Sequence, residues 1–183
     1  MRNMFYLIAD SAKQLKNPKA LVTTALMTAF GVVLHSFGTI PISNDLMIKW
    51  AFLPMAVVGM LYGAVPAAIC GGLIDVISTL IMPKASGGFF FGITLCMMAS
   101  GFLYGLFLYK TEKITSRAII STAVNFIVVT MLLTTAVLTL SYGSPFVPLL
   151  VTRLVKAALL PLEAVLIIVI LKALKKLLKN IRR

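Results

Sequence analysis

Long apolar runs interrupted by a few charged residues limit what this chain can fold into. The run Leu149 to Leu171 is long enough to cross a bilayer, which takes about 20 apolar residues in a helix, yet it contains Arg153, Lys156 and Glu163. An ionised side chain at mid-membrane depth costs roughly 2.5–3.5 kcal/mol on insertion scales, so such residues face a protein interior or a wet cavity. The run therefore indicates a membrane helix that lines a polar site.

The composition agrees with an integral membrane protein. Hydrophobic residues make up 60% of the 183 positions and charged residues 12%, against about 25% charged in a typical soluble domain. Both cysteines, Cys70 and Cys96, lie in apolar stretches, which favours buried thiols over a disulfide. The basic residues lie at the ends of apolar runs and not in a soluble domain, so we expect no nucleic-acid partner.

The apolar segments predict an all-α, six-transmembrane-helix bundle that forms a single domain. The expected spans are 20–38, 49–63, 65–82, 89–109, 117–141 and 147–172. Because Gly63 to Pro66 form a turn without charge, residues 51–82 could instead be one broken hairpin of two short helices. Apolar residues at helical spacing within residues 1–19 favour an interfacial helix before the first span. Residues 173–183 form a basic tail.

The distribution of Lys and Arg favours one orientation in the membrane. Most of the 17 lie before the first span, in the connection after the fourth span or in the tail, and only Lys49 and Lys84 lie near the opposite face. Cytoplasmic loops of membrane proteins carry an excess of Lys and Arg, so both termini are expected in the cytoplasm. The net charge of +12 then reflects topology and attraction to anionic lipid headgroups of the bilayer.

A carboxylate in the third span could share one depth with the cations of the sixth. At about 1.5 Å per residue, Asp75 lies about 12 Å from the outer end of its span, and Arg153 and Lys156 lie about 9 and 14 Å into theirs. Two cations against one acid would leave a positive charge for an anionic ligand. Alternatively the charges only neutralise one another and fix helix packing, and we expect this structural role for the deeper Glu163.

Other residues extend this candidate ligand site. Asn125 in the fifth span offers donor and acceptor groups, and Thr94 in the fourth offers a hydroxyl. Lys49 at the entry of the second span is a further cation for an anionic ligand. Phe89 and Phe91 could stack on a flat ring, although aromatic residues at this position also serve as anchors at the membrane interface.

Motifs of catalysis and energy conversion are missing from the sequence. It contains no Gly-rich phosphate loop ending in Lys-Ser or Lys-Thr, no His-Glu-x-x-His motif and one histidine in total. We therefore expect no enzyme activity, no metal site and no cofactor. At this length, a self-contained transporter built from internal repeats is also disfavoured, so the chain is expected to work with partners.

Small residues in the first span could form a docking face. Ala25 and Ala29, with Gly31, follow a small-xxx-small pattern, which lets another helix approach closely. The alternative is packing within the chain.

Short segments follow one another across nearly the whole chain in an order and spacing that resemble a known family. They are 49–54 (KWAFLP), 59–63 (GMLYG), 71–75 (GGLID), 91–95 (FGITL), 101–105 (GFLYG), 153–156 (RLVK) and 161–163 (PLE). Together they resemble the substrate-binding S components of energy-coupling factor (ECF) vitamin transporters, and within this family the folate-specific branch.

The resemblance implies a vitamin-binding pocket near the outer face, covered by the loops at 39–48, 83–88 and 142–146. For folate, Asp75 would accept hydrogen bonds from the pterin ring, and the glutamate carboxylates would favour Arg153, Lys156 or Lys49. Pantothenate or another acidic vitamin also suits a net positive pocket, so this alternative stays open. A structural or channel-like membrane protein, whose charges only fix helix packing, is the alternative from another class.

The resemblance also implies partner subunits in the bacterial cell membrane. Ala25 and Ala29 correspond to the family's Ala-x-x-x-Ala element, which implies docking against a transmembrane coupling subunit. Two ATP-binding cassette subunits would supply the energy, so ATP would be used only by partners. The binding subunit would reorient in the membrane to carry its ligand inward.

Overall fold

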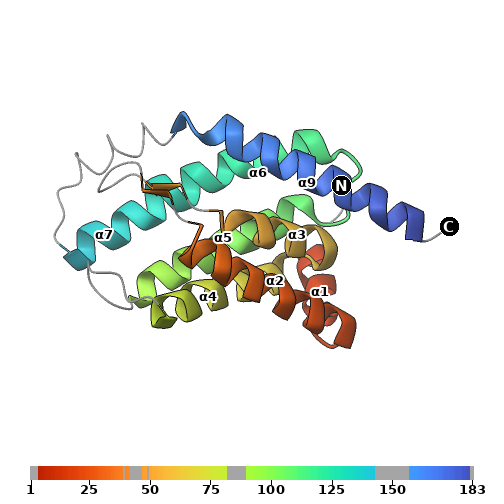
Figure 1. The fold of residues 1–183 in the computed structure, drawn as a ribbon, viewed down its shortest axis with the longest axis horizontal. Helices are drawn as coiled ribbons and strands as arrows, with labels where there is room; N and C mark the ends of the chain where they lie inside the picture. The colour runs from red at the N-terminus through yellow and green to blue at the C-terminus, as the bar shows by residue number, and fades with distance from the viewer. Residues whose placement is uncertain are drawn as a thin grey trace.

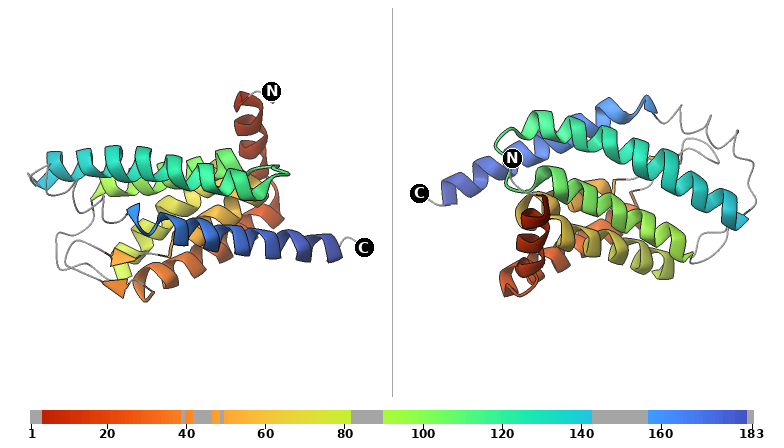
Figure 2. Two further views of the ribbon diagram at one scale, coloured as in Figure 1. Left: turned by 90° about the horizontal axis from the view of Figure 1, so that it is seen from above. Right: turned by 180° about the vertical axis from the view of Figure 1, so that it is seen from behind.

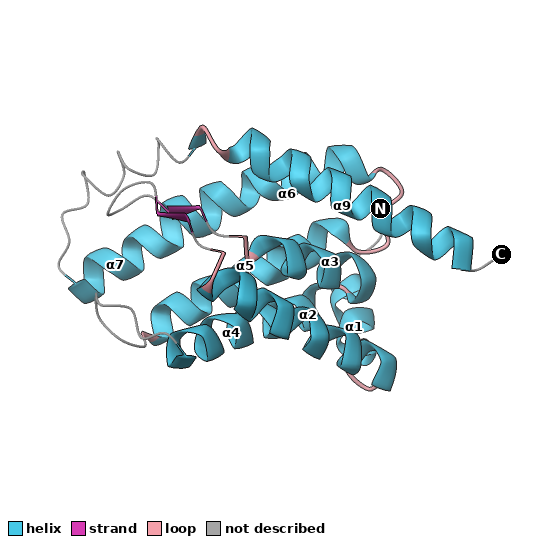
Figure 3. Cartoon of the chain, viewed as in Figure 1, coloured by secondary structure: helices cyan, strands magenta, loops and turns pink. Residues whose placement is uncertain are grey.

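The computed structural model describes residues 4–38, 40–41, 47–48, 50–81, 90–142 and 157–181, and nearly all of them are helical (Figure 3). The helices are α1 (Met4–Gln14), α2 (Pro18–Ser36), α3 (Phe52–Tyr62), α4 (Ala64–Ile81), α5 (Phe91–Leu108), α6 (Ile114–Asn125), the π-helix η1 (Phe126–Thr134), α7 (Thr135–Tyr142) and α9 (Leu160–Ile181). The predicted all-α class holds except for one small hairpin, in which β1 (Ile40–Pro41) pairs antiparallel with β2 (Met47–Ile48).

Four stretches of the described chain are long and apolar enough to cross a membrane. They are Pro18–Ser36, Ala64–Ile81, Phe91–Leu108 and Ile114–Leu140, which correspond to the expected first, third, fourth and fifth spans. The expected second span is the shorter apolar helix α3, whose 11 residues measure about 16 Å. The start of the expected sixth span lies outside the described residues, and α9 continues through most of the basic tail to Ile181.

A break separates α3 from α4 at the turn expected from Gly63 to Pro66, although only α3 is short, since α4 has 18 residues. Gly63 adopts a φ of 92°, a conformation that glycine reaches without a steric penalty, and its N–H donates to the Gly59 carbonyl at 3.0 Å to end α3. A Cβ at Gly63 would lie 2.6 Å from Ser11 Oγ. Ser11 Oγ itself accepts a hydrogen bond from the Val65 N–H at 2.9 Å, so α1 closes the turn at which α4 begins.

Helix α5 lies at the centre of the bundle. It packs against α3, α4 and α6, while α9 covers α3 and α6, and α2 covers α3 and α4 (Figures 1 and 2). The fully buried side chains include Met55 of α3, Ile74 of α4, Leu108 of α5 and Ile167 of α9. Each long helix also exposes large apolar side chains, as expected where lipid covers the outer surface.

The expected fifth span is one continuous helix that contains a long π-helical stretch. Helix α6 passes into the nine-residue η1 and then into α7. Two hydroxyls support the wider turn by donating to carbonyls five residues earlier, from Thr134 to Val129 at 2.8 Å and from Thr135 to Thr130 at 3.3 Å. Such stretches are rare and occur often at functional sites, and no sequence pattern predicted this one.

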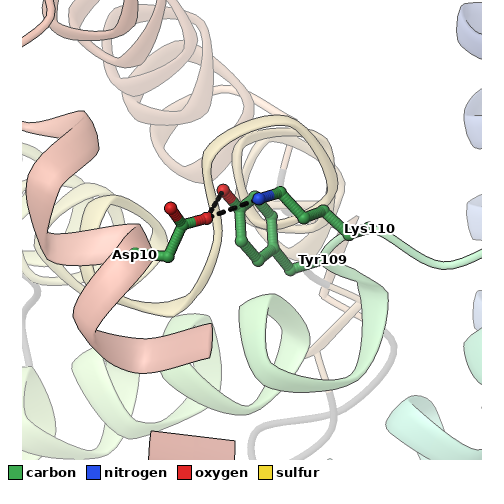
Figure 4. Close-up of polar contacts among 3 residues, drawn as sticks. All are labelled: Asp10, Tyr109 and Lys110. Atoms are coloured by element: carbon green, nitrogen blue, oxygen red, sulfur yellow. Dashed lines mark hydrogen bonds and ion pairs between the residues drawn. The ribbon is translucent and has the colours of Figure 1, made fainter. Parts of the chain in front are cut away.

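Both termini lie at one end of the bundle, and β1 and β2 lie nearer the other (Figure 1). At the terminal end, α1 runs across the other helices (Figure 2). Asp10 Oδ2 fixes it by accepting hydrogen bonds from the Tyr109 hydroxyl at 2.7 Å and from Lys110 Nζ at 2.6 Å (Figure 4). The helix predicted before the first span is therefore present and anchored to the end of α5, and its place at the membrane interface stays a prediction.

Asp10→Asn is expected to lower the free energy of unfolding by about 1 kcal/mol at neutral pH, the order of one charge-assisted contact on a partly exposed pair. The hydrogen bonds from Lys110 and Tyr109 lower the pKa of the Asp10 carboxyl below its ordinary 3.8. A carboxyl with a lowered folded-state pKa stabilises the fold above its ordinary pKa and loses this contribution as pH falls through the folded-state value.

Thermal unfolding of both proteins in the same detergent, at neutral pH and near pH 3, measures the effect of Asp10. The difference between wild type and Asp10→Asn should shrink in acid. The hydrogen bond to Asp10 raises the pKa of Lys110. Ionisation of Lys110 therefore stabilises the fold fully below the ordinary pKa of a lysine, and this stabilisation is lost only at strongly alkaline pH. An equal difference at both acidic and neutral pH would contradict this account.

Candidate ligand site

Asp75 and Thr94, both predicted to lie in the site, are in direct contact. Asp75 of α4 is 6% exposed and Thr94 of α5 is 4% exposed, and Thr94 Oγ1 donates to Asp75 Oδ2 at 2.8 Å. The hydroxyl of Ser78 donates to the Asp75 backbone carbonyl at 3.1 Å. No described donor is bonded to the second carboxylate oxygen of Asp75. The pair therefore presents a buried, oriented acceptor.

Small residues bring α4 and α5 close enough for this contact. A Cβ on Gly71 would collide with the Met97 carbonyl oxygen, and one on Gly72 would lie 2.7 Å from Met98 Cγ. Glycines at such an interface let two backbones approach closely, as is common between membrane helices. Of the two, Gly71 meets backbone and so sets how closely α4 and α5 can approach beside Asp75 and Thr94, whereas Gly72 meets only side chains.

Asn125 occupies a deeper level and ties α5 to α6. It is buried, and its Nδ2 donates to the Ser100 carbonyl at 3.0 Å. Ser100 lies six residues beyond Thr94 on α5, about 9 Å along the helix axis. The structure therefore does not bring Asn125 to the Asp75 pair, although its side-chain carbonyl remains an acceptor at this second level.

Glu163 lies deeper still. It lies within electrostatic reach of the Tyr104 hydroxyl, which also interacts with Thr122. Tyr104 is ten residues beyond Thr94, about 15 Å toward the end that holds the termini. This depth separates Glu163 from Asp75, and the structural role expected for Glu163 stays a prediction.

The remaining predicted ligand contacts are placed only in part. Arg153, Lys156, Lys49 and Phe89 lie outside the described residues, so their roles stay predictions. Phe91 begins α5 and is 63% exposed. This exposure favours the membrane-anchor alternative for Phe91 over stacking on a ligand ring.

The predicted docking face divides into an exposed and a buried part. Ala25 and Ala29 are exposed on α2, among large apolar side chains that are also exposed, such as Leu26 and Phe30. Gly31 is buried instead, and a Cβ there would lie 2.8 Å from Ile74 Cγ1 of α4. The alanine pair remains available to a partner helix, whereas Gly31 serves packing within the chain.

Two hydroxyls that the sequence analysis did not select lie buried at the end of the bundle opposite the termini. Ser36 Oγ ends α2 and Thr139 Oγ1 lies in α7, and neither has a hydrogen-bond partner among the residues described. The signal that could have identified them is the one used for Thr94, a hydroxyl within an apolar span. No group of three or more His, Cys, Asp or Glu in the described part of the chain could hold a metal ion.

Comparison with known proteins identifies the family. The family model described as "ECF transporter, substrate-specific component" matches residues 19–180. This chain is an ECF transporter S component. A protein named folate transporter FolT from Clostridium novyi (strain NT) is 30% identical over 154 residues, which cover 84% of this chain and 88% of the relative. A FolT from Streptococcus mutans serotype c is 26% identical over 136 residues, covering 71% and 72%.

Solved structures agree with this assignment. The crystal structure of FolT bound with folic acid matches with a TM-score of 0.74 and 29% identity, covering 82% of this chain and 91% of that chain. The S component for biotin from an ECF-type ABC transporter has the same fold, with a TM-score of 0.68 and 24% identity over 88% and 93% of the two chains. The resemblance read from the sequence is confirmed, and so is a multi-pass membrane transport subunit in place of an enzyme.

Proposed function

We propose that this ECF S component binds folate near the end of the bundle opposite the termini and delivers it to a coupling module. The observation that carries the proposal is the match to FolT, whose crystal structure contains folic acid and aligns over most of both chains. The buried pair of Asp75 and Thr94 supports it. A pterin ring presents adjacent N–H donors, which a carboxylate accepts in paired, charge-assisted hydrogen bonds.

The proposed roles follow from the charge and the hydrogen-bonding groups of each residue. Asp75 binds the pterin ring, and Thr94 holds the carboxylate in position. Arg153, Lys156 and Lys49 bind the glutamate carboxylates of folate. The alternative ligand, pantothenate, has no pterin-like edge for the Asp75 carboxylate.

The proposal includes six membrane spans, with α3 and α9 contributing the second and sixth, and termini in the cytoplasm. Two contacts support this orientation, because both place lysines at the end that holds the termini. Lys110 pairs with Asp10 of α1, and Lys175 of α9 donates to the Glu112 carbonyl at 3.3 Å. An excess of Lys and Arg marks the cytoplasmic side. Ala25 and Ala29 dock against the transmembrane coupling subunit, and two ATP-binding cassette subunits supply the energy.

Mass spectrometry of the small molecule released from protein purified without added vitamins tests the ligand. Folate is the expected mass, and isothermal titration should give tight binding of folic acid and none of pantothenate or biotin. Release and tight binding of pantothenate would overturn the folate assignment. A protein that releases no vitamin and binds none of the three would contradict the vitamin-binding function itself.

A further inference from the structure

An open cavity of about 420 Å³ is lined by residues at the start of α6 and in the middle of α9. These parts of the two helices lie at the end of the bundle that holds the termini (Figure 1). The lining residues of the cavity are Glu112, Lys113, Ile114, Thr115, Ser116, Lys172 and Lys175. The cavity therefore lies far along the helices from the Asp75 pair, and the proposed folate site does not account for it.

Three lysine side chains from two separate elements meet at this cavity, against one carboxylate. Lys175 Nζ donates to the Glu112 backbone carbonyl at 3.3 Å, which joins α9 to the turn between α5 and α6. No described carboxylate forms a salt bridge with Lys113, Lys172 or Lys175, whereas nearby Lys110 is paired with Asp10. The cavity thus keeps a net positive charge that the described chain does not neutralise.

The start of α6 adds to this positive field. Lys113 occupies the N-cap position without a side-chain capping hydrogen bond, and the first turn of α6 contains no acidic residue. The first N–H groups of a helix lack intrahelical acceptors, and the helix dipole makes this end favourable for anions. The lysines define the site, and the helix start strengthens it for an anion with several acceptor oxygens.

The position of the cavity matches the headgroup level of a bilayer. On α6, Ile119 and Ile120 follow within two turns of the cavity and are both exposed, as lipid-facing side chains are. On α9, Lys172 directly follows the fully buried Leu171, and the basic part of the helix begins there. The cavity therefore lies where an apolar outer surface gives way to a charged end, beside the phosphates of membrane lipids.

We propose that this cavity is a specific site for the phosphate group of an anionic phospholipid. Lys113, Lys172 and Lys175 bind the phosphate oxygens, and the acyl chains lie along the apolar surface of α6. A lipid held there links the α5–α6 turn to α9 and fixes the depth of this end of the protein in the membrane.

Native mass spectrometry of delipidated protein titrated with phosphatidylglycerol or phosphatidylcholine tests the site. The triple variant Lys113→Gln, Lys172→Gln, Lys175→Gln should bind the first phosphatidylglycerol at least about tenfold more weakly than wild type, because it loses the charge-assisted hydrogen bonds from the lysines to the phosphate oxygens. The matched control Lys16→Gln, Lys176→Gln, Lys179→Gln removes the same charge from exposed positions outside the cavity. It should bind within about twofold of wild type.

Three outcomes would overturn the lipid site. Equal weakening in both triple variants would indicate diffuse attraction to the basic end. Equal binding of phosphatidylcholine by wild type would exclude selection for anionic lipid. If wild type binds inorganic phosphate at millimolar concentration but does not bind phosphatidylglycerol, the ligand of the cavity is a soluble anion and not a lipid. Thermal unfolding checks that the triple variant folds. If it does not fold, the single variant Lys175→Gln replaces it, and a smaller loss of phosphatidylglycerol binding is expected.

Discussion

Asp75→Ala is expected to weaken folate binding by about 100-fold or more. Paired hydrogen bonds to a charged acceptor contribute about 1.5–3 kcal/mol each, and each 1.4 kcal/mol corresponds to a tenfold change in the dissociation constant. The substitution removes both acceptor oxygens from a residue that is 6% exposed, so the ring donors would be left unpaired in a buried site. Isothermal titration of purified protein with folic acid measures the loss.

Two further variants separate a ligand role from a packing role for Asp75. Asp75→Asn keeps an oxygen to accept the hydrogen bond from Thr94 but removes the charge, and an intermediate loss of affinity is expected. Ser78→Ala removes only the donor to the Asp75 backbone carbonyl, and binding should stay within about threefold of wild type, since a neutral hydrogen bond contributes about 0.5–1.5 kcal/mol. Unchanged affinity in a stable Asp75→Ala protein would show that the carboxylate only joins α4 to α5.

The contact between Asp75 and Thr94 could be approached from sequence because it is local in the topology. Asp75 lies six residues before the end of α4, and Thr94 lies three residues after the start of α5. Helices joined by a short connection run side by side, so residues at similar distances from that connection lie at similar depth. Counting along each span predicted a similar depth for the two residues, and the structure joins them by a hydrogen bond.

The attachment of α1 had no comparable signal. Asp10 meets Tyr109 and Lys110 across about a hundred residues of sequence, and an exposed ion pair leaves no periodic pattern. The apolar spacing of α1 predicted a helix, but this spacing cannot indicate what a polar residue on that helix will contact. The sequence did not predict the π-helix η1 either. Its residues are mostly apolar, so their pattern does not distinguish a π-helix from an α-helix.

The separation of Gly31 from Ala25 and Ala29 was predictable in principle. At about 100° per residue, Ala25 and Ala29 share one face of a helix, and Gly31 lies on nearly the opposite side. Because the three residues were grouped by their small size alone, Gly31 was assigned to the docking face together with Ala25 and Ala29. The structure corrects this by burying Gly31 against Ile74.

Gly101→Ala is expected to destabilise the bundle by about 3 kcal/mol or more, the upper end of the cost of overpacking a core. A Cβ at Gly101 would collide with the Ala67 carbonyl oxygen and lie 2.7 Å from its carbonyl carbon. These are backbone atoms of α4, which cannot turn aside as a side chain does, so the two helices must separate. Thermal unfolding in detergent and size-exclusion profiles measure the effect.

Gly72→Ala is the matched control, because it adds the same methyl group at the same helix pair. There the new atom would meet Met98 Cγ at 2.7 Å, and an unbranched, flexible methionine can repack at a cost below about 1.5 kcal/mol. Equal losses of stability in both variants would mean that the α4–α5 distance is adjustable. A large loss of stability only in Gly101→Ala would mean that backbone contact fixes the distance between α4 and α5. The hydrogen bond between Thr94 and Asp75 depends on the same distance. Folate affinity in any folded Gly101→Ala protein should therefore fall together with its stability, whereas Gly72→Ala should keep both.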